Sequence, residues 1–198
     1  MNKQVWIEKA LGLGVQEFEI YQSTTVEKEM TWFQGQMDTL VSSKVTGTSI
    51  RGIVDGKMAN MALEEVNDDQ CEIILKSLIE QAHIISNEET DSLRKPEPIE
   101  YVKKDVTWNM ASTECVKDIL QSLETKILAY DPRVIQVGYL GYSQGSGSRS
   151  IVNSLGMDVQ DADEMQYIVA SVVVKEEEEI KDASLVEVVY DFEKYDLD

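Results

Sequence analysis

The sequence predicts an α+β fold of two small α/β units, in which largely antiparallel sheets pack against amphipathic helices. Three observations predict it. Apolar residues recur at helical spacing over residues 71–85 and again over 116–128. Between and after these stripes, runs of β-branched and alternating residues indicate strands. Asp55-Gly56 is typical of a two-residue hairpin, because both central positions of a type I′ turn need a positive φ.

The first half predicts a helix, a long hairpin, a short hairpin and a second helix. Apolar and polar residues alternate from Phe18 and again towards Trp32, which indicates a long or bulged strand. The turn Gln34-Gly35-Gln36 leads into the next strand. Asn67 fits the N-cap of the second helix, and Gln70 three residues later completes a capping box.

The composition changes from Asn87 to Lys104, where dense charge with Pro96 and Pro98 excludes a helix and a central strand. We therefore predict a first domain over 1–92, a linker over 93–104 and a second domain over 105–198. The second domain is expected to begin with a helix and to continue as a β-meander, with a helix at 113–130 and strands at 134–142, 149–154, 158–175 and 183–190. Within it, the apolar stretch 165–174 predicts a central strand covered on both faces.

Charge and composition exclude several function classes. The net charge of −19 repels phosphate backbones, so we expect no binding of nucleic acid. No apolar run approaches the length of a membrane span, so we expect no membrane association. Cys71 and Cys115 fall on predicted helices and are interpreted as core thiols, which favours a cytoplasmic location.

Gly141-Tyr-Ser143-Gln-Gly145 formally matches the G-x-S-x-G nucleophile elbow. An elbow needs a following helix and a later histidine, but a Ser/Gly-rich segment and a strand follow here. The sole histidine, His83, lies upstream. We therefore predict a hairpin loop with no catalytic serine. The same loop lacks the Gly-Lys-Ser/Thr ending of a phosphate-binding loop.

Two acidic clusters are weak candidates for a hard cation. One comprises Asp161, Asp163 and Glu164, and the other runs from Glu176 to Glu179. The first lacks the twelve-residue spacing of an EF-hand. We predict a solvated hairpin tip for the first cluster and the loop between the last two strands for the second. No metal ligand and no catalytic residue is predicted.

The stretch from Gly47 to Ile85 runs strand, Asp-Gly turn, strand and helix, with Arg51 between two glycines. It resembles the first domain of the TldD/PmbA family, which comprises zinc-metallopeptidase-related proteins once called modulators of DNA gyrase. A second resemblance is the N-S-x-G element after β-branched residues. The matching positions, all interpreted as structural, are Gly47, Arg51, Gly52, Asp55, Gly56, Lys57, Asn153, Ser154 and Gly156. The chain departs from the family pattern at 59–61, which puts the packing of the return strand in question.

Arg51 has two interpretations. It could bind a peptide carboxylate or a partner. The preferred interpretation pairs it with Glu64 or Glu65 on the neighbouring strand.

The resemblance implies that chemistry lies outside this chain. Active family members hold zinc on an HExxxH helix plus a cysteine in a C-terminal domain, and this sequence has no such helix. It therefore implies no cofactor here, and a non-catalytic N-terminal region of a TldD/PmbA-like peptidase or of its inactive partner subunit. Such regions form a homo- or heterodimer with a family member and enclose a chamber for unfolded peptides, which exposed strand edges could hold. The alternative is a stand-alone acidic interaction module without enzymatic activity.

Overall fold

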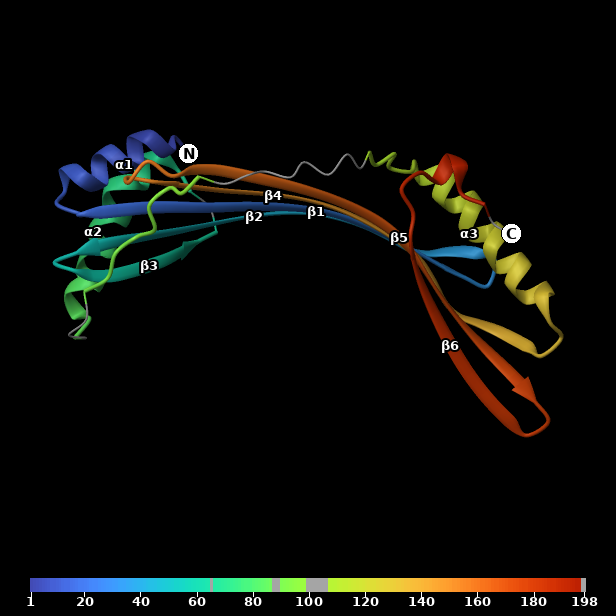
Figure 1. Cartoon of the computed structure of the whole chain (residues 1–198). Helices are drawn as coiled ribbons and strands as arrows, with labels where there is room; N and C mark the ends of the chain where they lie inside the picture. Colours follow the sequence, from blue (N-terminus) through green and yellow to red (C-terminus); the bar gives the residue numbers. More distant parts are fainter. Residues whose placement is uncertain (65, 87–89, 99–106, 197–198) are drawn as a thin grey trace. The chain divides into compact units, whose positions relative to one another are not determined.

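The computed structural model describes residues 1–64, 66–86, 90–98 and 107–196 (Figure 1). The elements are α1 (Lys3–Gly12), β1 (Glu17–Phe33), β2 (Gln36–Val54), β3 (Lys57–Leu63), the 3₁₀ turn η1 (Asp68–Gln70), α2 (Cys71–Ile84), α3 (Thr113–Tyr130), β4 (Val134–Asn153), β5 (Asp158–Glu176), β6 (Glu179–Val188) and the 3₁₀ turn η2 (Phe192–Lys194). The strands form one six-stranded sheet in the order β3-β2-β1-β4-β5-β6. The predicted α+β class is confirmed.

The chain forms two compact units that are interleaved along the sequence. The first unit comprises residues 1–24, 45–102 and 147–162, and the second comprises 25–44, 103–146 and 163–198. Each of β1, β2, β4 and β5 contributes to both units, because these strands are 17 to 20 residues long. The predicted domains, 1–92 and 105–198, are each one continuous stretch of the sequence, whereas each unit of the structure combines three separate stretches. The domain boundaries therefore stay a prediction. Residues 99–104 of the predicted linker lie outside the described part.

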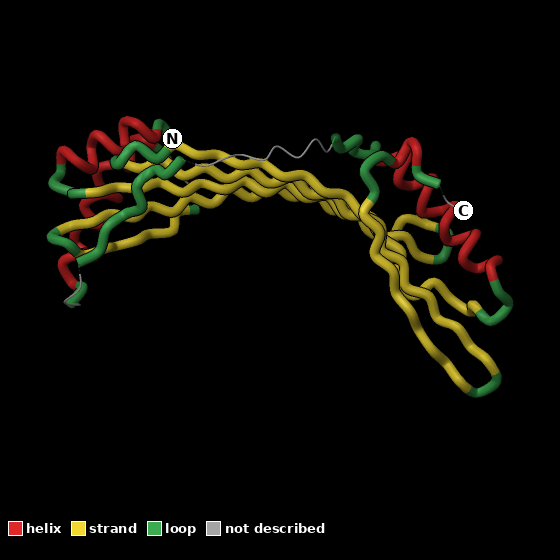
Figure 2. Tube along the Cα trace, viewed as in Figure 1, coloured by secondary structure: helices red, strands yellow, loops and turns green. Residues whose placement is uncertain are grey.

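In the first unit, α1 and α2 pack on one face of the strands (Figure 2). The predicted stripe of α2 is confirmed, since Cys71, Leu75, Leu78 and Ala82 are fully buried. The buried core comprises Trp6, Ile7, Ala10, Val15, Phe18, Ile20, Ile50, Val54, Ala59, Cys71, Leu75, Leu78 and Ala82.

The start of α2 differs from the expected capping box. The Asn67 side chain accepts a hydrogen bond from the backbone N–H of Asp69 (3.2 Å), and so caps η1 rather than α2. The helix begins four residues later at Cys71, and the Gln70 side chain makes no capping hydrogen bond. A 3₁₀ turn at a helix start is a common alternative, because it satisfies the first N–H groups by shorter-range bonds.

Two hairpin turns agree with the sequence. Asp55 and Gly56 adopt φ values of 48° and 74°, and β2 pairs with β3 from Val54↔Lys57 to Thr48↔Leu63. Gln34 and Gly35 also have positive φ, and they join β1 to β2.

In the second unit, α3 packs on the strands over its own core. This core comprises Met30, Trp32, Val116, Leu120, Val137, Leu140, Tyr142, Ile168, Val189 and Phe192. β5 pairs with β6 antiparallel from Tyr167↔Val188 to Glu176↔Glu179, so the acidic run 176–179 does form the predicted connection.

Three predictions for β4 and β5 are wrong. Residues 141–148 lie inside β4 rather than in a hairpin loop, because β1 and β5 hydrogen-bond β4 on either side and satisfy its backbone. Asp161, Asp163 and Glu164 lie inside β5 rather than at a tip. The stretch 165–174 is not covered on both faces: Gln166 is fully buried, whereas its neighbour Met165 is 47% exposed.

Candidate functional site

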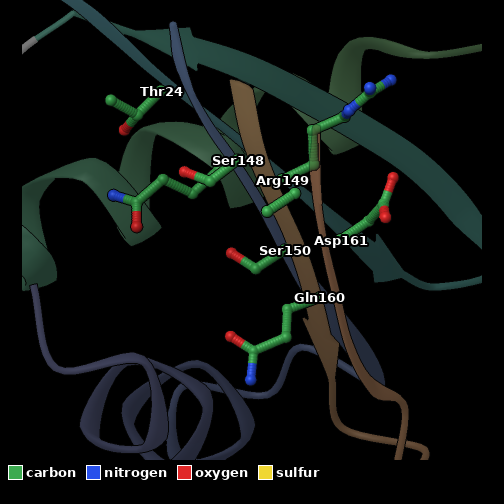
Figure 3. A pocket seen from close by; sticks show the side chains of 8 residues that line it. Thr24, Ser148, Arg149, Ser150, Gln160 and Asp161 are labelled. Carbon is green, nitrogen blue, oxygen red and sulfur yellow. The ribbon is translucent and has the colours of Figure 1, made fainter. Parts of the chain in front are cut away.

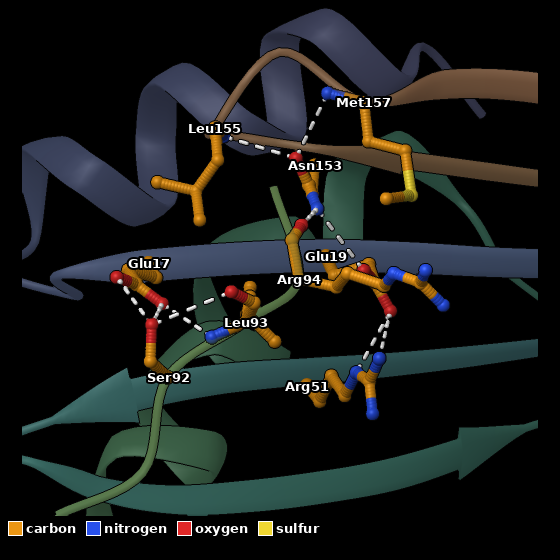
Figure 4. A network of polar contacts seen from close by, with 9 residues as sticks. All are labelled: Glu17, Glu19, Arg51, Ser92, Leu93, Arg94, Asn153, Leu155 and Met157. Carbon is orange, nitrogen blue, oxygen red and sulfur yellow. Dashed lines mark hydrogen bonds and ion pairs between the residues drawn. The ribbon is translucent and has the colours of Figure 1, made fainter. Parts of the chain in front are cut away.

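A buried carboxylate in the first unit connects two positions of the family-like motifs (Figure 4). Glu19 of β1 is 3% exposed. Arg51 of β2 donates from Nε to its Oε1 at 2.7 Å, and Arg51 Nη2 lies 2.7 Å from the same atom. Asn153, at the end of β4, donates from Nδ2 to Glu19 Oε2 at 3.1 Å. Three strands are therefore joined through one carboxylate.

The preferred partners of Arg51, Glu64 and Glu65, are wrong. Strand β2 lies between β1 and β3, and the pairing is with Glu19 of β1. The strand β3 ends at Leu63, before Glu64, and Glu65 lies outside the described residues. Sequence reasoning missed Glu19 because a glutamate between Phe18 and Ile20 resembles an ordinary solvent-facing strand position.

The Asn153 side chain also organises the turn that follows it. Its Oδ1 accepts hydrogen bonds from the backbone N–H groups of Leu155 and Met157, both at 3.0 Å. Its Nδ2 donates to the carbonyl of Arg94 at 2.9 Å, in addition to Glu19. Gly156 closes the turn with a φ of 93°, a region that favours glycine. Both ends of the amide are thus used in structure.

Neighbouring contacts fasten β1 in place. The Ser154 N–H donates to the carbonyl of Phe18 (2.8 Å), and the Phe18 N–H donates back to Ser154 Oγ (2.9 Å). A strap at residues 92–94 passes across the strands, and Ser92 Oγ and the Leu93 N–H both donate to Glu17 (Figure 4).

The other motif positions have separate structural settings. A Cβ on Gly52 would lie 3.0 Å from atoms of both Leu78 and Val15, so the close packing of α2 on β2 requires glycine. Lys57 is the first residue of β3, and Gly47 lies within β2. The structure therefore brings Arg51 and Asn153 together, but not Gly47 or Lys57.

A shallow pocket of about 250 Å³ opens beside Arg51. It is lined by Glu19, Tyr21, Ser49, Arg51 and Ile151. The Arg51 side chain is 43% exposed, whereas its partner Glu19 is buried. The guanidinium is already paired with that carboxylate, so the pocket presents no uncompensated charge. The pocket offers the guanidinium of Arg51, the phenol of Tyr21 and the hydroxyl of Ser49 for hydrogen bonding, but no arrangement of an acid, a base and a nucleophile.

A second pocket, of about 310 Å³, has a polar lining (Figure 3). It is lined by Gln22, Thr24, Ser148, Arg149, Ser150, Gln160, Asp161 and Ala162. The side chains of Arg149 and Asp161 point away from those of Ser148, Ser150 and Gln160 (Figure 3). Lys3 Nζ donates to Ser150 Oγ at 2.6 Å. Hydroxyl and amide groups in this arrangement can bind a polar group but cannot activate one.

The rejected catalytic elements have no supporting geometry. Ser143 lies within β4, so the strand-turn-helix arrangement of a nucleophile elbow is not formed. His83 of α2 lies beside Asp55, with 3.6 Å between Nε2 and Oδ2. Within the described part of the chain, no group of three His, Cys, Asp or Glu residues could hold a metal ion. No described helix is long and apolar enough to cross a membrane.

Two buried polar side chains in the second unit were not singled out from the sequence as anchors. Gln166 Oε1 accepts hydrogen bonds from the Tyr142 hydroxyl (2.9 Å) and from the N–H of Ala111 (3.1 Å). Burial raises the pKa of Tyr142 to about 12. Glu124 Oε2 accepts from Trp32 Nε1 (2.9 Å) and from the N–H of Gly35 (2.8 Å). Glu124 thus holds α3 against the β1–β2 turn.

Two protein-family models match parts of this chain. The family model described as PmbA/TldA metallopeptidase domain 1 matches residues 18–86, and the model described as PmbA/TldA metallopeptidase central domain matches residues 106–196. No protein of curated function matches the chain.

Solved structures with the same fold include proteins from three organisms. A "putative modulator of a DNA gyrase" from Thermotoga maritima is 18% identical with a TM-score of 0.80, and 98% of this chain covers 44% of that one. TldE from Thermococcus kodakarensis is 17% identical with a TM-score of 0.81, at coverages of 96% and 43%. A "putative modulator of DNA gyrase" from Bacteroides thetaiotaomicron is 18% identical with a TM-score of 0.80, at coverages of 96% and 45%. The chain thus spans less than half the length of these proteins.

Proposed function

Because the chain belongs to the PmbA/TldD family, we propose that it is the non-catalytic N-terminal region of a metallopeptidase of this family or of an inactive partner subunit. The observation that carries the proposal is the match to the first and central domain models over residues 18–86 and 106–196, in a chain that spans less than half the length of the solved relatives. We place the zinc chemistry in a further domain. The residues described here do not fit a zinc site, since they hold no suitable group of ligands.

In this proposal the region contributes to a dimer and to a chamber for unfolded peptides. Support comes from an unpaired strand edge in the second unit. β3 pairs with β2 only over residues 48–54, so no described strand pairs with the outer edge of residues 36–44. Met37, Leu40 and Val41 on this edge are 45%, 46% and 56% exposed. An extended peptide can add to such an edge by backbone hydrogen bonds, and the apolar side chains favour unfolded sequences.

Charge and cysteine usage support the rest of the proposal. A net charge of −19 disfavours nucleic acid as the partner. Both cysteines are free, and Cys71 is buried, which favours a reducing, cytoplasmic compartment.

The test is an incubation of the 198-residue protein with a fluorescent, permanently unfolded peptide, with and without added zinc. We expect binding, measured by fluorescence anisotropy, and no cleavage, measured by mass spectrometry. Val41→Lys should weaken peptide binding, whereas Ile73→Lys, at a 70% exposed position of α2 away from both strand edges, should not. Zinc-dependent cleavage would overturn the non-catalytic assignment, and absence of binding would overturn the peptide-handling role.

The alternative, a stand-alone acidic interaction module, is favoured by the large exposed strand surface. The residues encoded immediately after Asp198 distinguish the two. A continuation with an HExxxH segment supports an active peptidase, a continuation without it supports the inactive partner, and a stop codon supports the module.

A further inference from the structure

Strand β6 has one side without a partner among the described residues. It is the terminal strand of the sheet, next to β5 (Figures 1 and 2). All ten of its residues are exposed, including Ile180 (63%), Leu185 (65%) and Val186 (60%). A long, regular edge that exposes apolar side chains is an available template for another strand, because its outward N–H and C=O groups have no partner among the described residues.

The pairing with β5 determines which backbone groups of β6 point outward. The N–H of Val189 donates to the carbonyl of Gln166 at 3.2 Å, and these residues face each other in the β5–β6 register. Hydrogen-bonded and non-hydrogen-bonded pairs alternate along an antiparallel ladder. The odd-numbered residues of β6 therefore bond to β5. Residues 180, 182, 184, 186 and 188 direct their N–H and C=O groups to the free edge.

This alternation restricts how a second β6 could pair antiparallel with the first. The even-numbered residues of one β6 must face even-numbered residues of the other, because only these direct their N–H and C=O groups to the free edge. The two-fold axis therefore passes through a residue that faces its own copy, and not between two neighbouring residue pairs. With Ser184 facing Ser184 of the second copy, all five outward-directed residues find hydrogen-bonding partners. A shift of the axis by one residue, to Ala183, places Glu179 opposite Glu187 and costs like-charge repulsion.

The register centred on Ser184 also matches the side chains. Lys181 faces Glu187 of the second copy, and the symmetry repeats this opposite-charge pair. Ile180 faces Val188, and Ala183 faces Leu185, so apolar side chains meet on both faces of the new pair. No like charges stand opposite each other in this register.

We propose that β6 is a homodimerisation strand, pairing antiparallel with β6 of a second copy of this chain about a two-fold axis at Ser184. This inference deepens the dimerisation part of the proposed function by assigning the surface, the partner and the register. It does not depend on peptide binding, which was placed on β2.

Disulfide cross-linking between introduced cysteines tests the register of the two β6 strands directly. In a hydrogen-bonded antiparallel pair the facing Cα atoms lie about 5.5 Å apart, which is within the range a disulfide spans. Ser184→Cys should therefore form a covalent dimer under mild oxidation, seen on a non-reducing gel. Asp182→Cys should not, because the two copies of residue 182 would lie four residues, or about 13 Å, out of register. Ser171→Cys, the neighbour of Ser184 on β5, is the matched control for a strand that is not at the edge.

Native cysteines do not obscure this result. Cys71 is buried and Cys115 is partly buried, and the unmodified protein provides the background. Equal cross-linking at 182 and 184, or cross-linking of the Ser171→Cys control, would overturn the register.

Sedimentation equilibrium tests the dimer without a covalent bond. Ser184→Pro removes an N–H that points to the free edge and leaves the β5–β6 hydrogen bonds intact, so it should abolish the dimer while the thermal midpoint stays close to wild type. Lys181→Glu and Glu187→Lys should each weaken the dimer about tenfold, and the double charge exchange should restore it. A wild-type protein that stays monomeric at all soluble concentrations, or a double variant as weak as the singles, would overturn the proposal.

These outcomes are independent of the peptide assay. A monomer that binds unfolded peptide contradicts β6 pairing and leaves the proposed function in place. A β6 dimer that binds no peptide contradicts the peptide role alone.

Discussion

Arg51→Met tests the consequence of unequal burial in the Arg51–Glu19 ion pair. The Glu19 side chain is 4% exposed and the Arg51 side chain is 43% exposed. Removal of the arginine leaves a buried carboxylate that, among the described residues, still accepts a side-chain hydrogen bond from Asn153 at 3.1 Å. Breaking a buried pair in this way costs roughly 3–5 kcal/mol, and the partial exposure of Arg51 reduces that to about 2 kcal/mol. The free energy of unfolding should fall by this amount.

A second substitution separates the loss of the Arg51–Glu19 attraction from the cost of leaving the Glu19 carboxylate buried and unpaired. In the double variant Arg51→Met with Glu19→Gln, the uncompensated carboxylate is gone, so about 1 kcal/mol should be recovered relative to Arg51→Met alone. Urea unfolding with linear extrapolation measures each variant, and an unchanged slope shows that the folded state is comparable. The reasoning is refuted if the double variant is less stable than Arg51→Met, because Glu19 would then contribute independently of its partner.

Three further predictions concern other anchors. Gly56→Val should destabilise by about 1–2 kcal/mol, because φ is +74° at that position; thermal unfolding measures it. Glu124→Ala leaves the N–H groups of Trp32 and Gly35 without their acceptor and should cost about 2–3 kcal/mol, with a change in tryptophan fluorescence. The folded pKa of Tyr142 is raised from 10.0 to about 12, so the folded state holds this proton more tightly than the unfolded chain. The contribution of protonated Tyr142 to the free energy of unfolding is complete below pH 10 and falls as the pH rises towards 12. In Tyr142→Phe, the free energy of unfolding should therefore decrease less between pH 10 and pH 12, as measured by urea unfolding at a series of alkaline pH values.

Local signals predicted the local structure well. The apolar spacing of α2 and the Asp55-Gly56 turn needed nothing beyond short-range patterns, and both are present. The segment 141–148 was mispredicted because its Ser and Gly residues resemble a loop, whereas pairing with β1 and β5 makes it strand. Tertiary context decided that case.

The candidate site was less accessible from the sequence than the fold. Finding the partner of Arg51 requires the strand order β3-β2-β1, since glutamates occur on both sides of β2. A sequence does not state which neighbour a side chain will meet, because register arises from the assembled sheet. Gln166 shows the same limit, since its buried side chain hydrogen-bonds the backbone of Asn109 and Ala111 and the hydroxyl of Tyr142, which lie far from it in the sequence.

The reciprocal contact between Phe18 and Ser154 joins residues 136 positions apart in the chain. During synthesis β1 leaves the ribosome long before its partner β4 exists. At about 5–20 residues per second, this interval is roughly 7–27 s. Throughout it, the β1 edge that will receive β4 has no native partner, and its alternating apolar residues are open to association with other chains. The first strands are therefore exposed to association for the longest time, and folding is expected to be slow because the sheet closes through long-range pairing.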